Sequence, residues 1–313
     1  MSSAERLPWI AEDPVSKRLL EIARKVSDTS TTLLITGESG TGKDHFARLV
    51  HELGARRDAP FLKIDCASLP PHLVESELFG HERGSFTGAV DRKLGRLEMA
   101  GAGTIVLDEV AALDAAGQGK LLRVVQERVF ERLGGTEQLR IEARLMALTN
   151  TNLPAAVAEG RFREDLFFRL NVLSIAIPPL RERGADILPL AESLLGTLRK
   201  VHGKPHAQLS EPTQRMFAAY AWPGNIREMR NVLERAVLFS DGGLLEPENF
   251  SEALRAGFAG NAALRALRSL EEIEREAIAA TLEATRYGIS KSAEILGISR
   301  KTLLEKRKKF GLK

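Results

Sequence analysis

The 313-residue sequence is poor in cysteine and in long apolar runs. Its single cysteine, Cys66, excludes an internal disulfide framework and suits a reducing compartment. No apolar run approaches the ~20 residues that a membrane-spanning helix needs, and residues 1–11 lack the apolar core of a signal peptide. We therefore expect a cytoplasmic protein that does not contact a membrane.

The sequence also lacks a large net charge, but its charge is unevenly distributed. The formal net charge is only +3. Residues 286–313 carry nine lysines or arginines against Glu294 and Glu305, which leaves +7 in this segment and −4 in the remaining chain. A basic segment at the end of a slightly acidic chain indicates a contact with nucleic acid.

The most informative stretch is residues 37–44, which read G-E-S-G-T-G-K-D. The preceding run at 31–36 is apolar and β-branched, as is typical of a buried parallel strand. The apolar spacing at 46–53 predicts a helix that Gly54 can end. Strand, glycine-rich loop and helix in this order are the context of a phosphate-binding loop. Taken alone, the loop could also be a glycine-rich turn that binds nothing.

A phosphate-binding loop directs backbone N–H groups and the positive end of a helix at phosphates. We expect Lys43 to reach the β- and γ-phosphates of ATP. Asp44 stands where a serine or threonine hydroxyl usually touches Mg²⁺, so the metal must be held mainly from elsewhere. The predicted ATP-binding residues of the loop are Gly37, Glu38, Ser39, Gly40, Thr41, Gly42, Lys43 and Asp44.

A second apolar strand is predicted at 105–107, and it leads directly into two adjacent carboxylates, Asp108 and Glu109. Such a pair suits one group on Mg²⁺, here Asp108, and one group on the attacking water, here Glu109. Together with the phosphate-binding loop, the pair predicts an ATPase.

Three other features allow ordinary interpretations when each is taken alone. Phe86 lies in a glycine-rich segment, where it could be a stray aromatic on a mobile loop or an apolar anchor for a partner. Asn150 ends a predicted strand, where a turn residue is common. Arg163 and Arg169 could be solvated charges, and on a continuous helix they would lie about 240° apart and could not both face one phosphate.

The C-terminal part of the chain begins with a change in composition. Residues 251–268 are rich in alanine, glycine and arginine and have no long apolar face, so we interpret much of this stretch as a linker. Ser269 and Glu272 then form a capping box, which predicts a helix over 270–285.

Two short helices are predicted at the end of the chain. Ser290 can cap a helix that ends at Gly297, and Ser299 can cap a second, basic helix that continues to Lys309. This arrangement predicts a helix-turn-helix, and the alternative is a basic helix that is merely solvated. The residues expected to meet DNA are Arg300, Lys301 and Thr302, at base edges or nearby phosphates, and Lys306 and Arg307, mainly at phosphates.

Five segments together resemble the sigma-54-dependent transcription activators of the NtrC type, a group of AAA+ ATPases. The segments are G-E-S-G-T-G-K-D, E-L-F-G-H-E-R-G-S-F-T-G-A, I-V-L-D-E, W-P-G-N-I-R-E and A-E-I-L-G-I-S-R-K-T-L. The resemblance implies an α/β P-loop AAA+ core over 1–180 and a helical lid over 181–245. It also implies a linker over 246–268 and an all-α Fis-type helix-turn-helix domain over 269–313.

The resemblance implies further roles for individual residues. Phe86 and Thr87 would touch sigma-54, and Asn150 would sense the γ-phosphate. Arg163 and Arg169 would be arginine fingers that reach the nucleotide of a neighbouring subunit, and Arg227 of the lid would contact phosphates.

The resemblance also implies partners. The chain would form a ring, expected to be a hexamer, from dimers, and it would act on sigma-54 RNA polymerase while bound to an upstream site on double-stranded DNA. Because no receiver domain is recognised in the sequence, we expect control by a trans-acting regulatory protein, by expression level or by a segment outside this sequence. One alternative is a DNA-binding regulator with a vestigial ATPase. Another is a different AAA+ machine, against which the glycine-phenylalanine loop argues.

Asp65 departs from the family pattern, which usually has an asparagine whose amide holds the catalytic glutamate, here Glu109, in a switched-off pose. An ionised aspartate cannot donate a hydrogen bond, and two carboxylates that are brought close repel or share a proton. We therefore expect altered coupling between nucleotide state and loop movement. Asp65→Asn should change the ATPase rate or the nucleotide-dependent binding of sigma-54. Both quantities staying unchanged would contradict this hypothesis.

Overall fold

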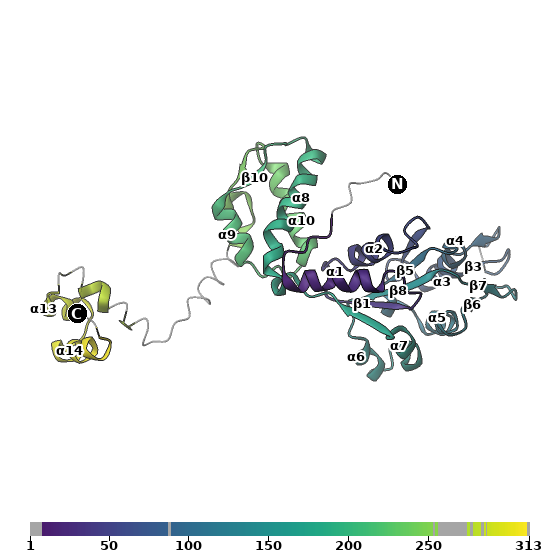
Figure 1. Ribbon diagram of the computed structural model, residues 1–313, viewed down its shortest axis with the longest axis horizontal. Coiled ribbons are helices and arrows are strands. Elements are labelled where there is room, and N and C mark those ends of the chain that lie inside the picture. Colours follow the sequence, from purple (N-terminus) through teal and green to yellow (C-terminus); the bar gives the residue numbers. More distant parts are fainter. Residues whose placement is uncertain are drawn as a thin grey trace. The chain divides into compact units, whose positions relative to one another are not determined.

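The computed structural model describes residues 8–86, 89–252, 254–255, 274–275, 278–282, 285 and 287–311. The chain divides into two compact units, Met1–Arg255 and Ala256–Lys313. The first unit holds the parallel sheet and, among its helices, α8 (Ile187–His202), α9 (Glu211–Ala219) and α10 (Asn225–Phe239), and the second holds the two helices near the C-terminus (Figure 1).

A five-stranded parallel sheet forms the centre of the first unit, with the strand order β2-β5-β8-β1-β9. All four pairs of neighbouring strands are parallel, so their carboxyl ends lie at one edge of the sheet. The loops that follow β1, β5 and β8 therefore meet at this edge. The strands are β1 (Leu33–Thr36), β2 (Phe61–Asp65), β5 (Thr104–Asp108), β8 (Arg144–Thr149) and β9 (Leu173–Ala176).

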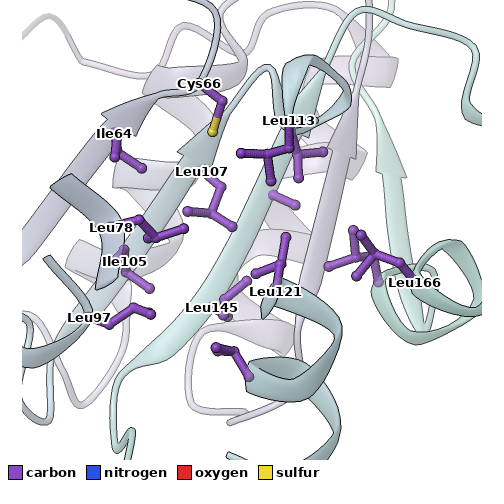
Figure 2. Packing of buried hydrophobic residues seen from close by; sticks show 14 of the residues in the cluster. Ile64, Cys66, Leu78, Leu97, Ile105, Leu107, Leu113, Leu121, Leu145 and Leu166 are labelled. Carbon is purple, nitrogen blue, oxygen red and sulfur yellow. The ribbon is translucent and has the colours of Figure 1, made fainter. Parts of the chain in front are cut away.

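Helices cover both faces of this sheet because the central strands are apolar on both sides. Successive residues point to opposite faces, so Leu33 and Ile35 pack with α1 and α2, whereas Leu34 packs with the helices of the other face. Figure 2 shows this second core, in which Ile105, Leu107 and other buried residues meet. The flanking helices are α1 (Pro14–Val26), α2 (Lys43–Leu53), α3 (Pro71–Phe79), α4 (Arg96–Met99), α5 (Ala115–Glu127), α6 (Leu153–Ala158) and α7 (Glu164–Leu170).

Cys66 follows β2 directly and lies in the second core (Figure 2). Its N–H donates to the carbonyl oxygen of Asp108 at 2.9 Å, which extends the pairing of β2 and β5 by one residue. Burial raises the pKa of the Cys66 thiol to about 12.

From Lys120 to Gly135 the sequence predicts one helix with Leu121, Leu122 and Val125 on one face, and this prediction is wrong at its C-terminal end. Helix α5 ends at Glu127 because Arg128 adopts a left-handed conformation with a φ of 60°. The β-branched and aromatic residues that follow, β6 (Val129–Phe130), pair antiparallel with β7 (Leu139–Arg140). A second antiparallel pair joins β3 (Gly80–His81) to β4 (Lys93–Leu94). The segments 82–92 and 131–138 are therefore the loops of two short hairpins.

The helical lid predicted after residue 180 is present, and it also contains short strands. Trp222 is fully buried in it and contacts the rings of Phe217 and Tyr220. Phe250 packs against Phe217 as well, and the described residues 246–252 and 254–255 of the expected linker belong to the same unit as the lid. The remainder of that linker lies outside the described residues. The lid elements are η2 (Leu180–Glu182), η3 (Gly184–Asp186), α8 (Ile187–His202), β10 (Gln208–Leu209), α9 (Glu211–Ala219), α10 (Asn225–Phe239), β11 (Leu244–Leu245) and η4 (Pro247–Asn249).

The second unit contains the helix-turn-helix expected from the sequence. Helix α14 (Arg300–Lys309) begins at the predicted cap, where the Ser299 hydroxyl accepts from the N–H of Thr302. The predicted Ser290 cap is wrong, because the cap of α13 (Ile289–Ile295) is Gly288, two residues earlier. The capping box at Ser269 and Glu272 lies outside the described residues, as does most of the helix expected over 270–285. A small core joins these helices through Ile278, Leu282, Ala293 and Leu303.

Asn225, the first residue of α10, is buried and makes hydrogen bonds to two other segments. It is fully buried with a φ of 52°, a backbone conformation in which asparagine is tolerated better than most residues. Its side chain accepts from the N–H of Leu180 at 2.7 Å and donates to the carbonyl oxygen of Ser39 at 3.1 Å. Asn225 therefore fastens the lid to the phosphate-binding loop.

Asn225→Ala should lower the free energy of unfolding by about 2–4 kcal/mol, because it leaves the N–H of Leu180 without its partner and places alanine in a left-handed conformation. Urea unfolding followed by tryptophan fluorescence measures the loss, since Trp222 is buried nearby in the lid. Asn231→Ala is the control, because this exposed residue lies on the same helix. Equal stability of the two variants would contradict the assigned role.

Candidate active site

The phosphate-binding loop connects β1 to α2 at the carboxyl edge of the sheet. Gly40 and Gly42 adopt φ values of 78° and 98°, which favour glycine. A Cβ atom at Gly40 would lie 2.5 Å from the carbonyl oxygen of Gly224 in the lid. Glycine is therefore required here both by the turn and by the close approach of the lid.

Lys43 opens helix α2 and is almost completely buried. Its ammonium donates to the carbonyl oxygens of Gly37 and Glu38 at 2.8 and 3.1 Å and lies 4.0 Å from a carboxylate oxygen of Glu109. Burial lowers the pKa of Lys43, and the acidic side chains nearby oppose this effect. The structure thus brings the lysine of the loop to the carboxylate that follows β5.

Glu109 lies just beyond β5 in a left-handed conformation with a φ of 50°. Its Oε2 accepts from the backbone N–H of Asn150 at 3.0 Å, at the end of the neighbouring strand β8. The backbone of Asn150, and not its side-chain amide, therefore makes the contact with the predicted water-activating residue. Asp65 lies at the end of β2, and its Oδ1 accepts from the N–H of Ala67 at 2.9 Å. Among the contacts of the described residues, none joins Asp65 to Glu109.

Asp44 and Asp108 share a cation that the sequence did not predict. The ammonium of Lys63 lies 2.5 Å from Asp44 Oδ2 and 2.7 Å from Asp108 Oδ2. The one signal in the sequence was a lysine in the otherwise apolar first four residues of β2. Two carboxylates that already hold a cation are suitable ligands for Mg²⁺, which usually takes one or two carboxylates and completes its coordination with phosphates and water.

The lid closes over the phosphate-binding loop through charged and polar side chains. Arg181 makes a two-point contact with Glu38 at 2.6 and 2.9 Å. Arg227 donates to the hydroxyl of Ser39 at 2.5 Å, and the buried Arg183 donates to the carbonyl oxygen of Thr41 at 2.6 Å. Arg227 therefore lies beside the loop that would hold the phosphates it is predicted to contact, whereas Arg181 and Arg183 were not predicted to reach this loop.

Two of the cavities beside this loop border Gly42. One of about 330 Å³ contains the charged groups and is lined by residues that include Lys43, Asp44, Asp108, Glu109 and Arg227. The other, of about 140 Å³, is mainly apolar and was not predicted. It is lined by Pro8, Trp9, Ile10, Gly42, His45, Arg183, Leu190, Ser193, Leu194 and Ile226.

Arg163 and Arg169 lie on another part of the first unit. Helix α7 begins at Glu164, so Arg163 precedes the helix and the angle expected for a continuous helix does not apply. Arg163 forms a two-point ion pair with Asp165 at 2.7 and 3.0 Å. Within the described part of the chain, no contact joins either arginine to Lys43, Asp108 or Glu109.

Phe86 lies in the loop that connects β3 to β4, and its side chain is 37% exposed. Its ring contacts His81 edge-on, with 5.0 Å between the centroids. Thr87 lies outside the described residues. At the start of this loop, Glu82 accepts a hydrogen bond from the buried Arg132 at 2.9 Å. Arg132 also donates to Glu137 at 2.9 Å and forms an ion pair with Glu98. Arg132 therefore ties the base of the Phe86 loop to the β6–β7 hairpin.

The predicted DNA-binding residues differ in how free their side chains are. Arg300 and Lys301 are exposed at the start of α14. Thr302 bonds to the Ser299 hydroxyl at 2.7 Å, so its side chain belongs to the cap. Lys306 forms an ion pair with Glu274 at 2.5 Å, and Arg307 is half-buried.

Three known protein families match successive segments of the chain, with boundaries close to those of the predicted domains. Residues 9–176 match the sigma-54 interaction domain, residues 181–267 the AAA+ ATPase lid domain, and residues 269–310 the Fis family of bacterial regulatory proteins. The chain belongs to the sigma-54-dependent transcription activators. The predicted fold, a P-loop AAA+ core with a helical lid and a Fis-type helix-turn-helix, is confirmed.

Individual relatives are similar over nearly the whole of this chain. The transcriptional regulatory protein FlbD of Caulobacter vibrioides is 40% identical over 97% of this chain and 70% of its own length. The alginate biosynthesis regulator AlgB of Pseudomonas aeruginosa is 43% identical over 96% of this chain and 67% of its own. The nitrogen fixation protein AnfA of Azotobacter vinelandii is 41% identical, and this match covers 95% of the present chain but only 56% of AnfA.

Among solved structures, NtrX from Brucella abortus in complex with ATP is 32% identical, with a TM-score of 0.72, over 97% of this chain and 69% of that one. None of the helices in the described part of the activator has the length and apolar character that crossing a bilayer requires.

The Glu38–Arg181 contact predicts a pH-dependent contribution to stability. The Arg181 guanidinium, followed by the Asn225 amide, lowers the pKa of Glu38 from 4.5 to about 2. A carboxylate with a lowered pKa stabilises the folded state above its unfolded pKa, and this contribution is lost as the pH falls toward 2. Wild type should therefore exceed Glu38→Gln in Tm at about pH 6, and the difference should shrink by about pH 3.

Differential scanning fluorimetry across this range measures the difference in Tm. Arg181→Met is the matched variant, because it removes the other half of the contact and should abolish the same pH dependence. The assignment would be refuted by a difference between wild type and Glu38→Gln that stays constant over the range.

Proposed function

We propose that this activator hydrolyses ATP to ADP and phosphate and uses the reaction to remodel sigma-54 RNA polymerase at a promoter. The observation that carries the proposal is the position of Lys43, 4.0 Å from Glu109, in a chain that matches the sigma-54 interaction domain. We assign the ATPase core to residues 1–180, the lid to 181–245 together with the residues of 246–255 that belong to the same compact unit, the linker to the rest of 246–268 and the DNA-binding domain to 269–313.

The residues of the site divide the chemistry among them. The loop N–H groups and Lys43 bind the phosphates, and the apolar cavity beside Gly42 has the lining that an adenine base requires. Asp108, with Asp44 beside it, would hold Mg²⁺. The ion would neutralise the charge of the β- and γ-phosphates. Glu109, oriented by the N–H of Asn150, accepts the proton of the attacking water.

We assign Arg163 and Arg169 to the active site of a neighbouring subunit. Arg163 lies 48% exposed beside Asp165, so its guanidinium can exchange this carboxylate for a phosphate without leaving a buried group unpaired. Phe168 and Val172 are exposed next to Arg169, which supports contact with another subunit at this surface. The proposal is a ring, expected to be a hexamer built from dimers.

The output of the reaction is movement of the Phe86 loop toward sigma-54. Phe86 is partly exposed, and its loop is joined through Arg132 to the β6–β7 hairpin, which follows α5. Asn150 serves as the γ-phosphate sensor at the end of β8. Thr87 would contact sigma-54 beside Phe86. Asp65, at the end of β2, would influence the switch between nucleotide states.

At the other end of the chain, α14 would place Arg300, Lys301 and Thr302 in the major groove of an upstream site on double-stranded DNA. Lys306 and Arg307 would meet phosphates, and Lys306 would have to leave Glu274 to do so. We propose cytoplasmic action and control by a regulatory protein in trans. A DNA-binding regulator with a vestigial ATPase is the second candidate, but Lys43, Asp108 and Glu109 argue against it because all three are in place.

The test is ATPase activity against protein concentration, with capture of sigma-54 in the presence and absence of an ATP transition-state analogue. Turnover per subunit should rise with concentration, because Arg163 and Arg169 complete the site of a neighbour. Capture should depend on the analogue. Phe86→Ala should retain turnover and lose capture, because in the described part of the chain no contact joins the Phe86 ring to Lys43 or Glu109, and the residue lies in the loop assigned to sigma-54.

Two matched variants sharpen this experiment. Arg163→Ala should lose turnover and still bind ATP, whereas Arg161→Ala, an exposed arginine paired with Glu159 on the same segment, should retain turnover. Absence of turnover at every concentration would favour the vestigial ATPase. Capture that is unaffected by Phe86→Ala would refute the assigned contact with sigma-54.

A further inference from the structure

Lys63 makes a connection between two strands and a helix that no motif describes. It lies on β2, the edge strand next to β5, and its ammonium contacts Asp108 at the end of β5 and Asp44 in the first turn of α2. Its side chain is 35% exposed, whereas that of Asp108 is 17% exposed. These two carboxylates are the contacts that the structure gives the Lys63 side chain in its described part.

The position of this ammonium has a physical reason. Two carboxylates from different elements repel each other when no cation lies between them. A lysine ammonium is a compact charge on a flexible stem, so it can neutralise both and can also withdraw at little cost. A divalent cation that binds Asp108 from the side of Asp44 needs the space that this ammonium fills.

We propose that Lys63 is a displaceable counter-ion, which holds the cation position of the active site until Mg²⁺ arrives with a nucleotide. This inference rests on the proposed function, because it assigns Asp108 and Asp44 to the metal. The ammonium competes with free Mg²⁺ for the two carboxylates. Phosphates, which add ligands for the metal and also attract the released ammonium, shift this competition toward the metal.

This role differs from that of an ordinary ion pair. If Lys63 only stabilised the fold, its removal would leave the affinity for metal unchanged or would lower that affinity. A lysine that served mainly as a phosphate ligand would affect nucleotide affinity and not the binding of metal alone. A displaceable counter-ion competes with the metal, so its removal makes metal binding stronger.

The experiment measures Mn²⁺ binding by electron paramagnetic resonance, first without nucleotide and then with ADP. Lys63→Met should bind Mn²⁺ without nucleotide about fivefold more tightly than wild type, as expected for the loss of two partly exposed ion pairs. With ADP present, the ratio should be smaller, because the phosphates already favour the metal. Lys63→Gln should behave as Lys63→Met, and Lys63→Arg should restore weak binding.

Lys93→Met is the matched control, because Lys93 is also a partly exposed lysine on a strand and pairs with Glu77 away from the site. It should leave Mn²⁺ binding as in wild type. Circular dichroism shows whether each variant is folded, and the two neutral variants make the result independent of one side chain. Unchanged or weaker Mn²⁺ binding in both neutral variants overturns the inference.

Asp108→Asn separates this result from a failure of the proposed function. Loss of Mn²⁺ binding in Asp108→Asn, together with unchanged binding in the Lys63 variants, overturns the counter-ion and leaves the metal site in place. Mn²⁺ binding with ADP that does not change in Asp108→Asn overturns the metal site itself, and with it both proposals.

Discussion

The parallel pairing of β1, β8 and β5 is the constraint on which the site depends. It places the ends of three strands at one edge, so that Lys43, Asn150 and Glu109 meet although they are far apart in the sequence. The strands are buried on both faces, which fixes their register against helices on either side. A disturbance of this packing would separate the lysine from the carboxylate without touching either.

Several polar contacts join the lid to the backbone and side chains of the loop. Asn225 and Arg183 reach backbone oxygens of the loop, and Arg181 reaches Glu38. A ligand that enters between loop and lid therefore meets the same groups that hold the lid in place. Such an arrangement links occupancy of the loop to the position of the lid, and the exposed ion pair can exchange more readily than the buried contacts.

The features that were predicted well are those that a short run of consecutive residues determines. The loop at 37–44, the two carboxylates at the end of β5 and directly after it, and the Ser299 cap depend on local sequence, and they lie where expected. The end of α5 was missed because a single left-handed residue, Arg128, stops a helix whose apolar pattern continues. Lys63 and Arg132 were missed for another reason. Each owes its position to partners from other elements, and no local pattern carries that information.

Cys66 gives the protein a property of a different kind. Its thiol is buried, its pKa is raised to about 12, and it follows directly on Asp65 at the end of β2. Because it is the only cysteine in the sequence, no other thiol competes with it for an alkylating reagent. Its alkylation requires the end of this edge strand to open. The unmodified chain thus contains a single-site chemical reporter on the strand that carries Lys63 and Asp65.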